Sequence, residues 1–555
     1  MRKVGLEMQQ ALSSRWATRR AEKAQRLARI ASFAQRRLLP TERIVEALEA
    51  LLVPGDRVAL EGDNQKQADF LSRSLARVNP GVVHDLHLLI GSISRPEHLD
   101  LFEQGIAHRI DFAYAGPQSL RLAQCLEDGK LVIGAIHTYI ELYARMFTDL
   151  TPQVALVCAE KGDRRGNLYT GPNTEDTPTI VEATAFHDGI VIAQINELTD
   201  ELPRVDIPGS WIDFLVVADR PFALEPLFTR DPRHITEINI LMAMLVIRGI
   251  YAQHEVTSLN HGVGFDTAAI ELLLPTYGAS LGLQGKICRN WVLNPHPTLI
   301  PAIESGWVES VYCFGGEPGM EAYVAAHPDV FFTGSDGALR SNRVLAQLAG
   351  LYAIDLFIGS TLQMDGNANS STVMAGRLAG FGGAPNMGYD PHGRRHSSPA
   401  WLSLLSGESP VLRGRKLVVQ MVETFQKGGV PKLVESLDAI QVGTDAHLPI
   451  APVMIYGDDV SHVVTEEGIA YLYKAQSLEE RQQALAAIAG VSPIGLRSDP
   501  GRVEHLRSAG LVAFPEDLGI RRTEAKRSLL AAKSIEELVE WSGGLYQPPA
   551  RFRSW

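Results

Sequence analysis

Short apolar runs alternate with helical patterns along most of the chain. The apolar runs predict strands at residues 58–60, 82–90, 110–115, 131–136 and 154–158, and helical patterns such as 96–104 and 118–127 fit between them. The second half has the same style, with strand-like runs at 311–314, 330–332 and 353–358 and helices at 270–274 and 299–304. Alternating strands and helices are typical of a mostly parallel sheet with helices on both faces, so the pattern predicts an α/β fold.

The chain of 555 residues is too long for one ordinary domain, because domains have roughly 100–200 residues. The two halves share no close sequence repeat, yet both alternate in the same way. We therefore expect two α/β domains in tandem. The expected boundaries are a helical N-terminal extension over residues 1–52, a first domain over 53–235, and a second domain over 236–555 with a helical C-terminal tail.

The composition is that of an ordinary soluble globular protein, with 21% charged and 45% hydrophobic residues. The four cysteines lie far apart without a C-x-x-C pair, so we expect reduced thiols in the cytoplasm and neither a disulfide framework nor a zinc ribbon. No uncharged apolar run reaches the length of about 18 residues that spans a bilayer. The longest candidate, 238–250, contains Asn239 and Arg248 and predicts a buried helix, so no membrane contact is expected.

The charge is unevenly spread along the chain. Residues 1–37 carry ten Lys/Arg and two Asp/Glu, whereas the whole chain has a formal net charge of −12, which leaves −20 on the remainder. Residues 11–34 predict an amphipathic helix rich in arginine. Such a helix is found in docking surfaces, targeting peptides and nucleic-acid arms. A helix that packs on its own protein or on a partner subunit is favoured, since no secretory signal core and no DNA-binding pattern accompanies it.

Several catalytic motifs are incomplete. Gly285-Lys286 lacks the upstream glycine of a phosphate loop, and Gly262-Val-Gly264 lacks the third glycine of a dinucleotide fingerprint. His254-Glu255 has no second histidine at the spacing of a zinc protease. Residues 278–282 match G-x-S-x-G, but Pro275-Thr-Tyr precedes them in place of a strand, which argues against a catalytic Ser280. Nothing indicates a metal or a nicotinamide.

Four Gly/Asn-rich loops follow apolar segments in the second half, at residues 260–265, 315–319, 365–371 and 380–388. Glycine lets backbone N–H groups approach a ligand closely, and loops at the carboxyl ends of parallel strands form the ligand crevice of open α/β sheets. Each loop alone is as easily an ordinary turn. The set favours a site for an oxyanion, a thioester or a phosphate.

At these loops the sequence resembles a known family. The tract 463–472, followed by 477–481, is similar to the closing motif of acyl-CoA hydrolases and class I CoA transferases. Residues 166–171 and 190–196 resemble the hairpin and strand of that family's first domain, and His261-Gly-Val-Gly264 resembles its glycine turn before an active-site helix. The resemblance implies two tandem CoA-transferase-like domains with mostly parallel sheets flanked by helices, plus a helical N-terminal extension.

Nearly the whole chain resembles the alpha subunits of malonate decarboxylase, most specifically at residues 286–306 and 380–388. The resemblance implies an acetyl-[acyl-carrier-protein]:malonate transferase. Malonate would replace acetate on the thiol of a phosphoribosyl-dephospho-CoA arm that the acyl-carrier subunit bears, with no cofactor bound by this chain itself. Decarboxylase subunits would then act on the malonyl carrier within a cytoplasmic complex, without nucleic acid or membrane.

The chain departs from the wider family at one position. Class I CoA transferases use a glutamate nucleophile, and the resemblance places that glutamate at Asn290, whose amide is a poor nucleophile. We therefore expect no glutamyl-enzyme and a direct attack of malonate on the acetyl thioester. Glu304 and Glu317 are the alternative nucleophiles.

The site residues expected from the resemblance are of two kinds. Asn290 and the backbone N–H groups of Gly262 and Gly264 are the catalytic candidates, as donors to the reacting oxygens. The substrate-binding candidates are His261, Asn294, Arg289, Gly382, Gly383 and Asn386. Lys286 and Arg377 are further candidate cations for malonate, and Arg394-Arg395 for the carrier's phosphates. For each of them a turn glycine, a structural side chain or a solvated charge is the simpler interpretation.

Two other functions remain open. A CoA transferase or a citrate-lyase-type alpha subunit would act on another carboxylic acid, and a non-catalytic scaffold would only bind the carrier and other subunits. A substrate panel with malonate, citrate and acetate separates the first from the main hypothesis, and transfer by the purified chain excludes the second.

Overall fold

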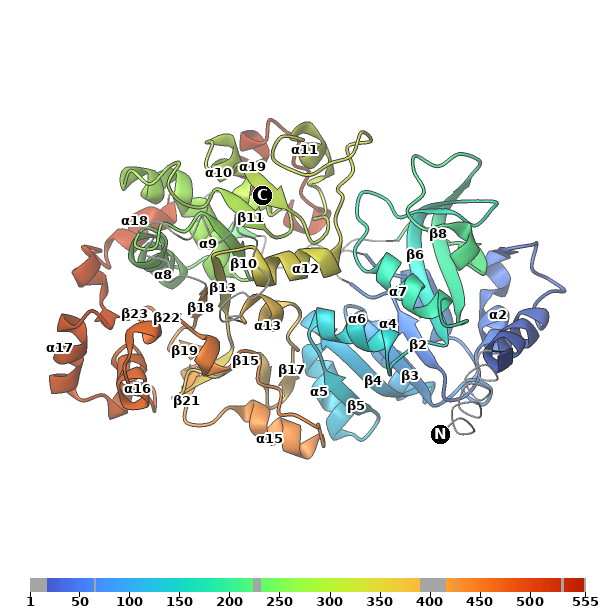
Figure 1. Cartoon of the computed structure of the whole chain (residues 1–555), viewed down its shortest axis with the longest axis horizontal. Helices are drawn as coiled ribbons and strands as arrows, with labels where there is room; N and C mark the ends of the chain where they lie inside the picture. Colours follow the sequence, from blue (N-terminus) through green and yellow to red (C-terminus); the bar gives the residue numbers. More distant parts are fainter. Residues whose placement is uncertain are drawn as a thin grey trace, which may run out of the picture. The chain divides into compact units, whose positions relative to one another are not determined.

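The computed structural model describes residues 17–63, 66–222, 231–389, 416–426, 428–530 and 534–553. The chain divides into two compact units, Met1–Glu225 and Pro226–Trp555 (Figure 1). The division falls before the expected boundary at residue 235. Residues 1–52 belong to the first unit, because Leu38–Leu39 (β1) forms the edge strand of its sheet by pairing with β9 (Phe214–Val217).

The first unit is built on one sheet with the strand order β1-β9-β8-β6-β2-β3-β4-β5, and β7 pairs with β6. All pairs along this order are parallel, and only the β6–β7 pair is antiparallel. The remaining strands are β2 Arg57–Leu60, β3 Leu86–Ser92, β4 Ala107–Tyr114, β5 Val132–Ile136, β6 Val154–Asp163, β7 Leu168–Tyr169 and β8 Ile190–Thr199.

The helices of the first unit lie between consecutive strands in the sequence, as the alternation predicts (Figure 1). Their starts carry recognisable signals: Pro96 stands in the first turn of α4, and Thr138 and Glu141 form a capping box on α6. The helices are α2 Ile44–Leu51, α3 Asp69–Leu75, α4 Pro96–Glu103, α5 Ser119–Glu127, α6 Tyr139–Phe147 and α7 Thr177–Ala185, preceded by a helical segment at 17–28.

The second unit has a sheet with the order β12-β11-β10-β13-β18-β22-β23-β24. The pairs from β12 to β22 are parallel, and the β22–β23 and β23–β24 pairs are antiparallel. Its strands are β10 Ser258–His261, β11 Asn290–Val292, β12 Ser310–Tyr312, β13 Leu356–Ser360, β18 Leu417–Met421, β22 His462–Val464, β23 Ile469–Ala470 and β24 Val512–Ala513.

Helices and short hairpins complete the second unit. The helices are α8 Glu237–Val246, α9 Phe265–Leu273, α10 Ile300–Glu304, α11 Glu321–Ala326, α12 Arg343–Tyr352, α13 Ala384–Met387, α15 Asp438–Asp445, α16 Leu478–Ala487, α17 Pro500–Ser508, α18 Glu524–Leu530 and α19 Ile535–Trp541. The short strands are β14 Gln363–Asp365, β15 Ser370–Ser371, β16 Val373–Met374, β17 Arg377–Leu378, β19 Phe425–Gln426, β20 Val430–Pro431 and β21 Leu433–Val434.

Alternating side chains of β13 divide the apolar interior of the second unit between two faces. Leu356 and Ile358 join the cluster that includes residues of α8 and α9, whereas Phe357 joins the cluster with residues of α12 and α16. Because successive strand residues point to opposite faces, the sheet is covered on both sides and its loops are left to form the sites. No helix in the described part of the chain is both long enough and apolar enough to cross a membrane.

Both sheets contain one topological switch point. In the first unit the chain proceeds outward from β2 through β3, β4 and β5 and then returns to place β6 on the other side of β2. In the second unit it proceeds from β10 through β11 and β12 and returns to place β13 beside β10. Ligands of open α/β sheets bind at the carboxyl ends of the strands beside such a point.

The basic N-terminal segment packs on its own unit. Arg20 pairs with Asp188 at 3.1 Å, Lys23 with Asp213 at 2.9 Å and Arg26 with Asp56 at 2.8 Å, and the side chain of Ile30 is fully buried. The partners precede or begin strands β2, β8 and β9, so the segment lies along the amino edge of the sheet. The prediction that this segment docks on the acidic body is confirmed for the described residues.

Candidate functional site

The switch point of the second unit brings the turn after β10 against β13. The Gly262 N–H donates to the Ile358 carbonyl at 2.7 Å, and a Cβ on Gly262 would lie 3.0 Å from the Gly359 Cα. Residue 262 must therefore be glycine for the two backbones to approach this closely. The Gly262 N–H is thus engaged with β13 in this structure, and its role as an oxyanion donor stays a prediction.

Gly264 immediately precedes α9, and the turn that holds it is fixed by one hydroxyl. Thr267 Oγ1 donates to the carbonyls of Gly262 at 2.7 Å and Gly264 at 3.0 Å. The first N–H groups of a helix have no partner within the helix and attract anions. Since the start of α9 lies at the carboxyl edge of the sheet, beside the switch point, Gly264 keeps its place as a candidate donor.

A buried glutamate, which the sequence reasoning missed, is hydrogen-bonded to the residue that precedes this turn. Glu271, in α9, accepts hydrogen bonds from His261 Nδ1 at 3.0 Å, from His296 Nδ1 at 2.9 Å and from the Thr298 hydroxyl. The other ring nitrogen of His261 forms a hydrogen bond with the Tyr251 hydroxyl at 2.8 Å. His261 ends β10, and His296 and Thr298 follow β11, so one carboxylate joins two loops of the crevice.

The charge of Glu271 depends on these partners. Complete burial alone would raise the pKa of its carboxyl, but the adjacent His296 and His261 outweigh burial and hold that pKa well below its ordinary value. His261 itself is buried and both its ring nitrogens are engaged. The His261 ring therefore links the turn to Glu271 and Tyr251, and its role in binding substrate stays a prediction. The signal in the sequence was an acidic residue in the apolar second half of the helix, after Ala268-Ala-Ile270.

A second polar cluster lies at the same edge, at the ends of β13 and β18. Asp266 accepts from Ser360 Oγ at 2.6 Å and from Asn239 Nδ2 at 2.5 Å. Glu423 lies 3.5 Å from Asn239 Nδ2 and is paired with Lys432 Nζ at 3.0 Å. Burial raises the pKa of Asp266. The cluster supplies two carboxylates and one cation beside the glycine turn.

Asn290 and Arg289 lie at the opposite edge of the sheet. Asn290 is the first residue of β11 and pairs with Ser258, the first residue of β10. It is exposed, and its amide oxygen accepts from Ser310 Oγ at 2.8 Å. Arg289 forms an exposed ion pair with Glu309 at 2.6 Å. In a parallel sheet the start of a strand is a strand's length away from the carboxyl edge, so Asn290 and Arg289 lie apart from the Gly262–Gly264 turn, and their expected roles stay predictions.

Asn294 does lie at the expected edge. It is nearly buried, two residues after the end of β11, in the loop whose His296 and Thr298 bind Glu271. The structure thus places Asn294 in the loop beside the Gly262–Gly264 turn.

The 380–388 loop makes its described contacts elsewhere. A Cβ on Gly383 would overlap Gln347 of α12, and Asn386 Nδ2 lies 3.5 Å from Gln347 Oε1. Gly382 has a positive φ of 59° and serves a tight turn. No described hydrogen bond joins this loop to the Gly262–Gly264 turn, so Gly382, Gly383 and Asn386 are placed as supports of α12 and α13.

The alternative nucleophiles and cations are also placed. Glu304 accepts from the Tyr323 hydroxyl at 2.7 Å and lies 3.3 Å from His327 Nε2, so its carboxylate is already engaged. Glu317 is buried in the loop after β12. Ser280 is exposed within a helical turn and donates to the Tyr277 carbonyl, without the strand that a nucleophile elbow needs. Lys286 and Arg377 are exposed, and Arg394-Arg395 lie outside the described residues.

The first unit has a buried ion pair at its own switch point. Glu61 follows β2, accepts from the Cys158 N–H at 2.7 Å and pairs with Lys66 Nζ at 3.2 Å, and the Thr177 hydroxyl also donates to Glu61. Burial opposes the charge on Lys66, yet the nearby Glu61 raises the pKa of that amine. Sequence reasoning missed this pair, because the five-residue spacing matches no motif.

Comparison with known proteins identifies what the chain is similar to. The family described as "malonate decarboxylase, alpha subunit, transporter" matches residues 15–555. An acetyl-S-ACP:malonate ACP transferase from Malonomonas rubra is 56% identical over 532 residues, which cover 94% of this chain and 96% of that protein.

Two solved structures are similar over nearly their whole length. A Pseudomonas malonate decarboxylase hetero-tetramer in complex with malonate contains a chain with 70% identity and a TM-score of 0.93, covering 97% of this chain and 99% of that one. The malonate decarboxylase alpha subunit of Acinetobacter baumannii has 66% identity and a TM-score of 0.92, covering 97% and 100%.

A more distant likeness concerns the fold alone. An acyl-CoA transferase from Escherichia coli O157:H7 shares 13% identity at a TM-score of 0.51, covering 80% of this chain and 89% of that one. The expected fold class, an α/β chain of CoA-transferase type with mostly parallel sheets flanked by helices, is confirmed.

Proposed function

The chain belongs to the malonate decarboxylase alpha-subunit family, and on that premise we propose that it catalyses the exchange of acetate for malonate on the thioester of an acyl carrier protein. The observation that carries the proposal is the 56% identity, over 94% of the chain, to an acetyl-S-ACP:malonate ACP transferase. The geometry supports it, because the carboxyl edge of the second sheet brings together the start of α9, the Gly262–Gly264 turn and the loop of Asn294.

The substrates and partners follow from the same premise. The carrier subunit presents its thiol on a phosphoribosyl-dephospho-CoA arm, and this chain binds no cofactor of its own. Decarboxylase subunits convert the malonyl carrier back to the acetyl carrier within one cytoplasmic complex. The relative solved as a hetero-tetramer supports such an assembly.

The exchange requires no proton transfer. A malonate carboxylate oxygen adds to the acetyl carbonyl, the C–S bond breaks, and the thiolate leaves behind a mixed acetyl–malonyl anhydride. The thiolate then adds to the malonyl carbonyl, a new C–S bond forms, and acetate leaves with the oxygen that joined the two acyl groups. One negative charge passes from carboxylate to thiolate and back, so the site has to orient the reactants and stabilise two oxyanions.

The described residues meet these needs at the carboxyl edge. Backbone N–H groups of Gly264 and the first turn of α9 stabilise the oxyanion, each well-placed donor contributing about 3–4 kcal/mol. The Asn294 amide donates to a malonate carboxylate. Glu271 orients the two loops that carry the donors and touches no reactant.

A substrate panel tests the proposed function. The purified chain is incubated with acetylated carrier and with malonate, citrate or acetate, and the carrier is examined by intact-mass spectrometry. We expect a malonyl carrier and no citryl carrier. A citryl product would favour a citrate-lyase-type subunit, and an unchanged carrier with every acid would favour a scaffold.

A trapping experiment tests the route. After incubation with acetyl carrier, treatment with borohydride or hydroxylamine should leave the chain unmodified. A modified glutamate, whether Glu423 at the crevice or Glu304 or Glu317 elsewhere, would contradict direct transfer and indicate a glutamyl-enzyme.

A further inference from the structure

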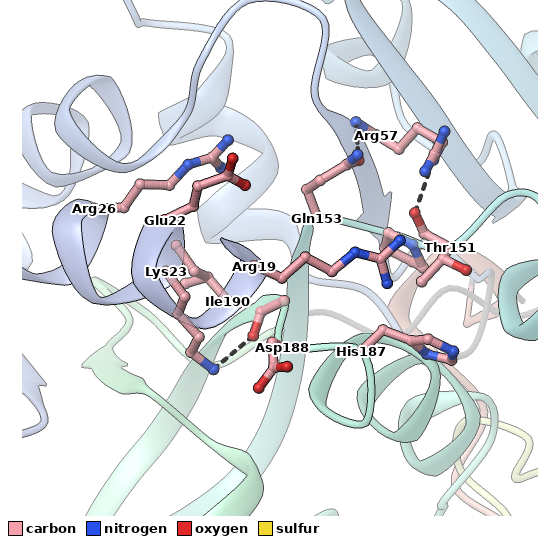
Figure 2. A pocket seen from close by; sticks show the side chains of 12 residues that line it. Arg19, Glu22, Lys23, Arg26, Arg57, Thr151, Gln153, His187, Asp188 and Ile190 are labelled. Carbon is pink, nitrogen blue, oxygen red and sulfur yellow. Dashed lines mark hydrogen bonds between the residues drawn. The ribbon is translucent and has the colours of Figure 1, made fainter. Parts of the chain in front are cut away.

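A cavity of about 110 Å³ lies at the amino edge of the first unit's sheet, beneath the helical segment 17–28. Residues at the starts of β2, β6 and β8 line it together with the helix, and Figure 2 shows the side chains that converge there. Its volume is several times the roughly 10–15 Å³ that one water needs. Because the reaction is placed at a carboxyl edge in the second unit, this cavity is a separate feature.

Four cations and two carboxylates, Glu22 and Asp188, line the cavity. Arg26 binds both oxygens of Asp56 at 2.8 Å, Lys23 pairs with Asp213 at 2.9 Å, and Asp188 pairs with Arg20 at 3.1 Å. Among the described residues, no carboxylate forms an ion pair with Arg19 or Arg57. Within this part of the chain, these two guanidinium groups are therefore the lining cations without an ion pair, with Glu22 as the lining carboxylate outside an ion pair.

Arg57 is held in position by the segment that precedes β6. Its Nε donates to the Thr151 carbonyl at 2.7 Å, and Figure 2 shows the Arg19 side chain extending toward the same stretch of chain. Arg19 and Arg57 line the same cavity. Burial lowers the pKa of Arg57 and the positive charge of Arg19 lowers it further, whereas the carboxylates of Asp149 and Asp56 raise it. Like charges in close proximity are destabilising unless an anion lies between them.

We propose that Arg19 and Arg57 bind a phosphate-type oxyanion in this cavity, either free phosphate or the phosphate of a larger molecule. A guanidinium binds oxyanions through two parallel N–H···O bonds, and a tetrahedral phosphate has enough oxygens to accept such a pair from each arginine. The occupant also neutralises the repulsion between the two arginines and fixes the helical segment to the sheet. This site is distinct from the site proposed for acyl transfer, and it assigns phosphate binding to the first unit.

Titration of the full-length chain with inorganic phosphate tests the proposal. Isothermal calorimetry at constant ionic strength, with chloride as the balancing anion, should show saturable binding. Arg19→Glu places a carboxylate beside Arg57 and should weaken phosphate binding by about tenfold or more. Arg29→Glu makes the same charge change in an exposed residue beyond the cavity and should leave binding unchanged.

Thermal unfolding gives a second readout on the same variants. Phosphate should raise the Tm of the wild type and of Arg29→Glu, but leave the Tm of Arg19→Glu unchanged, because the new carboxylate already occupies the place of the anion. Ribose 5-phosphate is compared with inorganic phosphate to distinguish the two sources: tighter binding of the ester indicates a larger ligand, and tighter binding of the free ion indicates phosphate itself.

Three results would overturn the proposal. One is the absence of saturable phosphate binding to the wild type, and another is binding that Arg19→Glu does not weaken. The third is binding to the isolated chain that disappears in the assembled complex, since this would assign the cavity to an acidic side chain of a partner subunit.

Discussion

The carboxylate of Glu271 accepts hydrogen bonds from residues of two different loops, at His261 and at His296. Replacing it by glutamine removes the charge that these histidines stabilise and turns one of the two accepting oxygens into an NH2 donor that faces other buried donors. We expect Glu271→Gln to lower the free energy of unfolding by about 3 kcal/mol, as for other broken buried pairs, and to slow transfer because both loops lose their anchor. Urea unfolding and the transfer assay measure the two effects.

The pH dependence of this variant follows from the lowered pKa of Glu271. A group whose pKa is lower in the folded state stabilises the fold fully above the pKa of the unfolded chain and loses that contribution as the pH falls. The difference in stability between wild type and Glu271→Gln should therefore be constant at neutral pH and shrink below about pH 4.5, the ordinary value for a glutamate. A difference that grows on acidification would contradict the assignment.

Two asparagines, one at the start of β11 and one in the loop that follows its end, give a matched pair of substitutions. Asn294 follows β11 at the carboxyl edge, whereas Asn290 begins β11 and is exposed. Asn294→Ala should slow transfer by about tenfold through the loss of one donor to a charged oxygen, and Asn290→Ala should change it by less than about threefold. An equal loss of transfer rate in both variants would instead favour a site at the amino edge, near Asn290.

The contrast shows what residue types in a sequence can and cannot establish. The glycine turn at 262–264 and the loop with Asn294 were recognisable, because their composition is unusual. The placement of Asn290 at the amino edge could not be predicted, since the position of a residue along its strand decides which edge it reaches. Glu271 was missed because its partners come from two separate loops of the chain. Lys66 was missed because its five-residue spacing from Glu61 matches no motif.

At the scale of elements, the close approach of the turn after β10 to β13 is the feature most sensitive to one methyl group. The Cβ of Gly262→Ala would lie 3.0 Å from the Gly359 Cα, so the strands must separate. We expect a loss of about 1–3 kcal/mol in stability together with reduced transfer. Gly366→Ala is the control, because its Cβ would meet only Ile494 at 3.9 Å. Guanidinium unfolding compares the two, and equal stabilities would argue against the close approach.

The basic helical segment allows a separate prediction. It contributes three ion pairs with aspartates of the first unit and buries Ile30. Deleting residues 1–37 should lower the stability by about 3 kcal/mol or more, and higher salt should narrow the difference, while the transfer rate of the folded protein is retained. A deletion that abolishes transfer without loss of stability would place this segment in the reaction.

At the scale of the whole molecule, two units without a close sequence repeat are built on sheets that switch direction in the same way, at β2/β6 and at β10/β13. The alternation of strands and helices predicted this class, because burial on both faces of a parallel sheet leaves apolar runs in the sequence. The strand order and the boundary at residue 225 could not be predicted from the sequence, because they depend on long-range pairing and on β1, a two-residue strand.

The central claim is that malonate attacks the acetyl thioester directly, and transfer of an oxygen isotope tests it. Malonate labelled with ¹⁸O is mixed with acetyl carrier and an excess of the chain, so that each enzyme molecule turns over once. Direct attack sends the bridging oxygen out with the leaving group, so the acetate should carry one ¹⁸O when malonyl carrier has formed. Unlabelled acetate, with the label retained in a carboxylate of the protein, would contradict the account and show that a glutamyl-enzyme lies on the path.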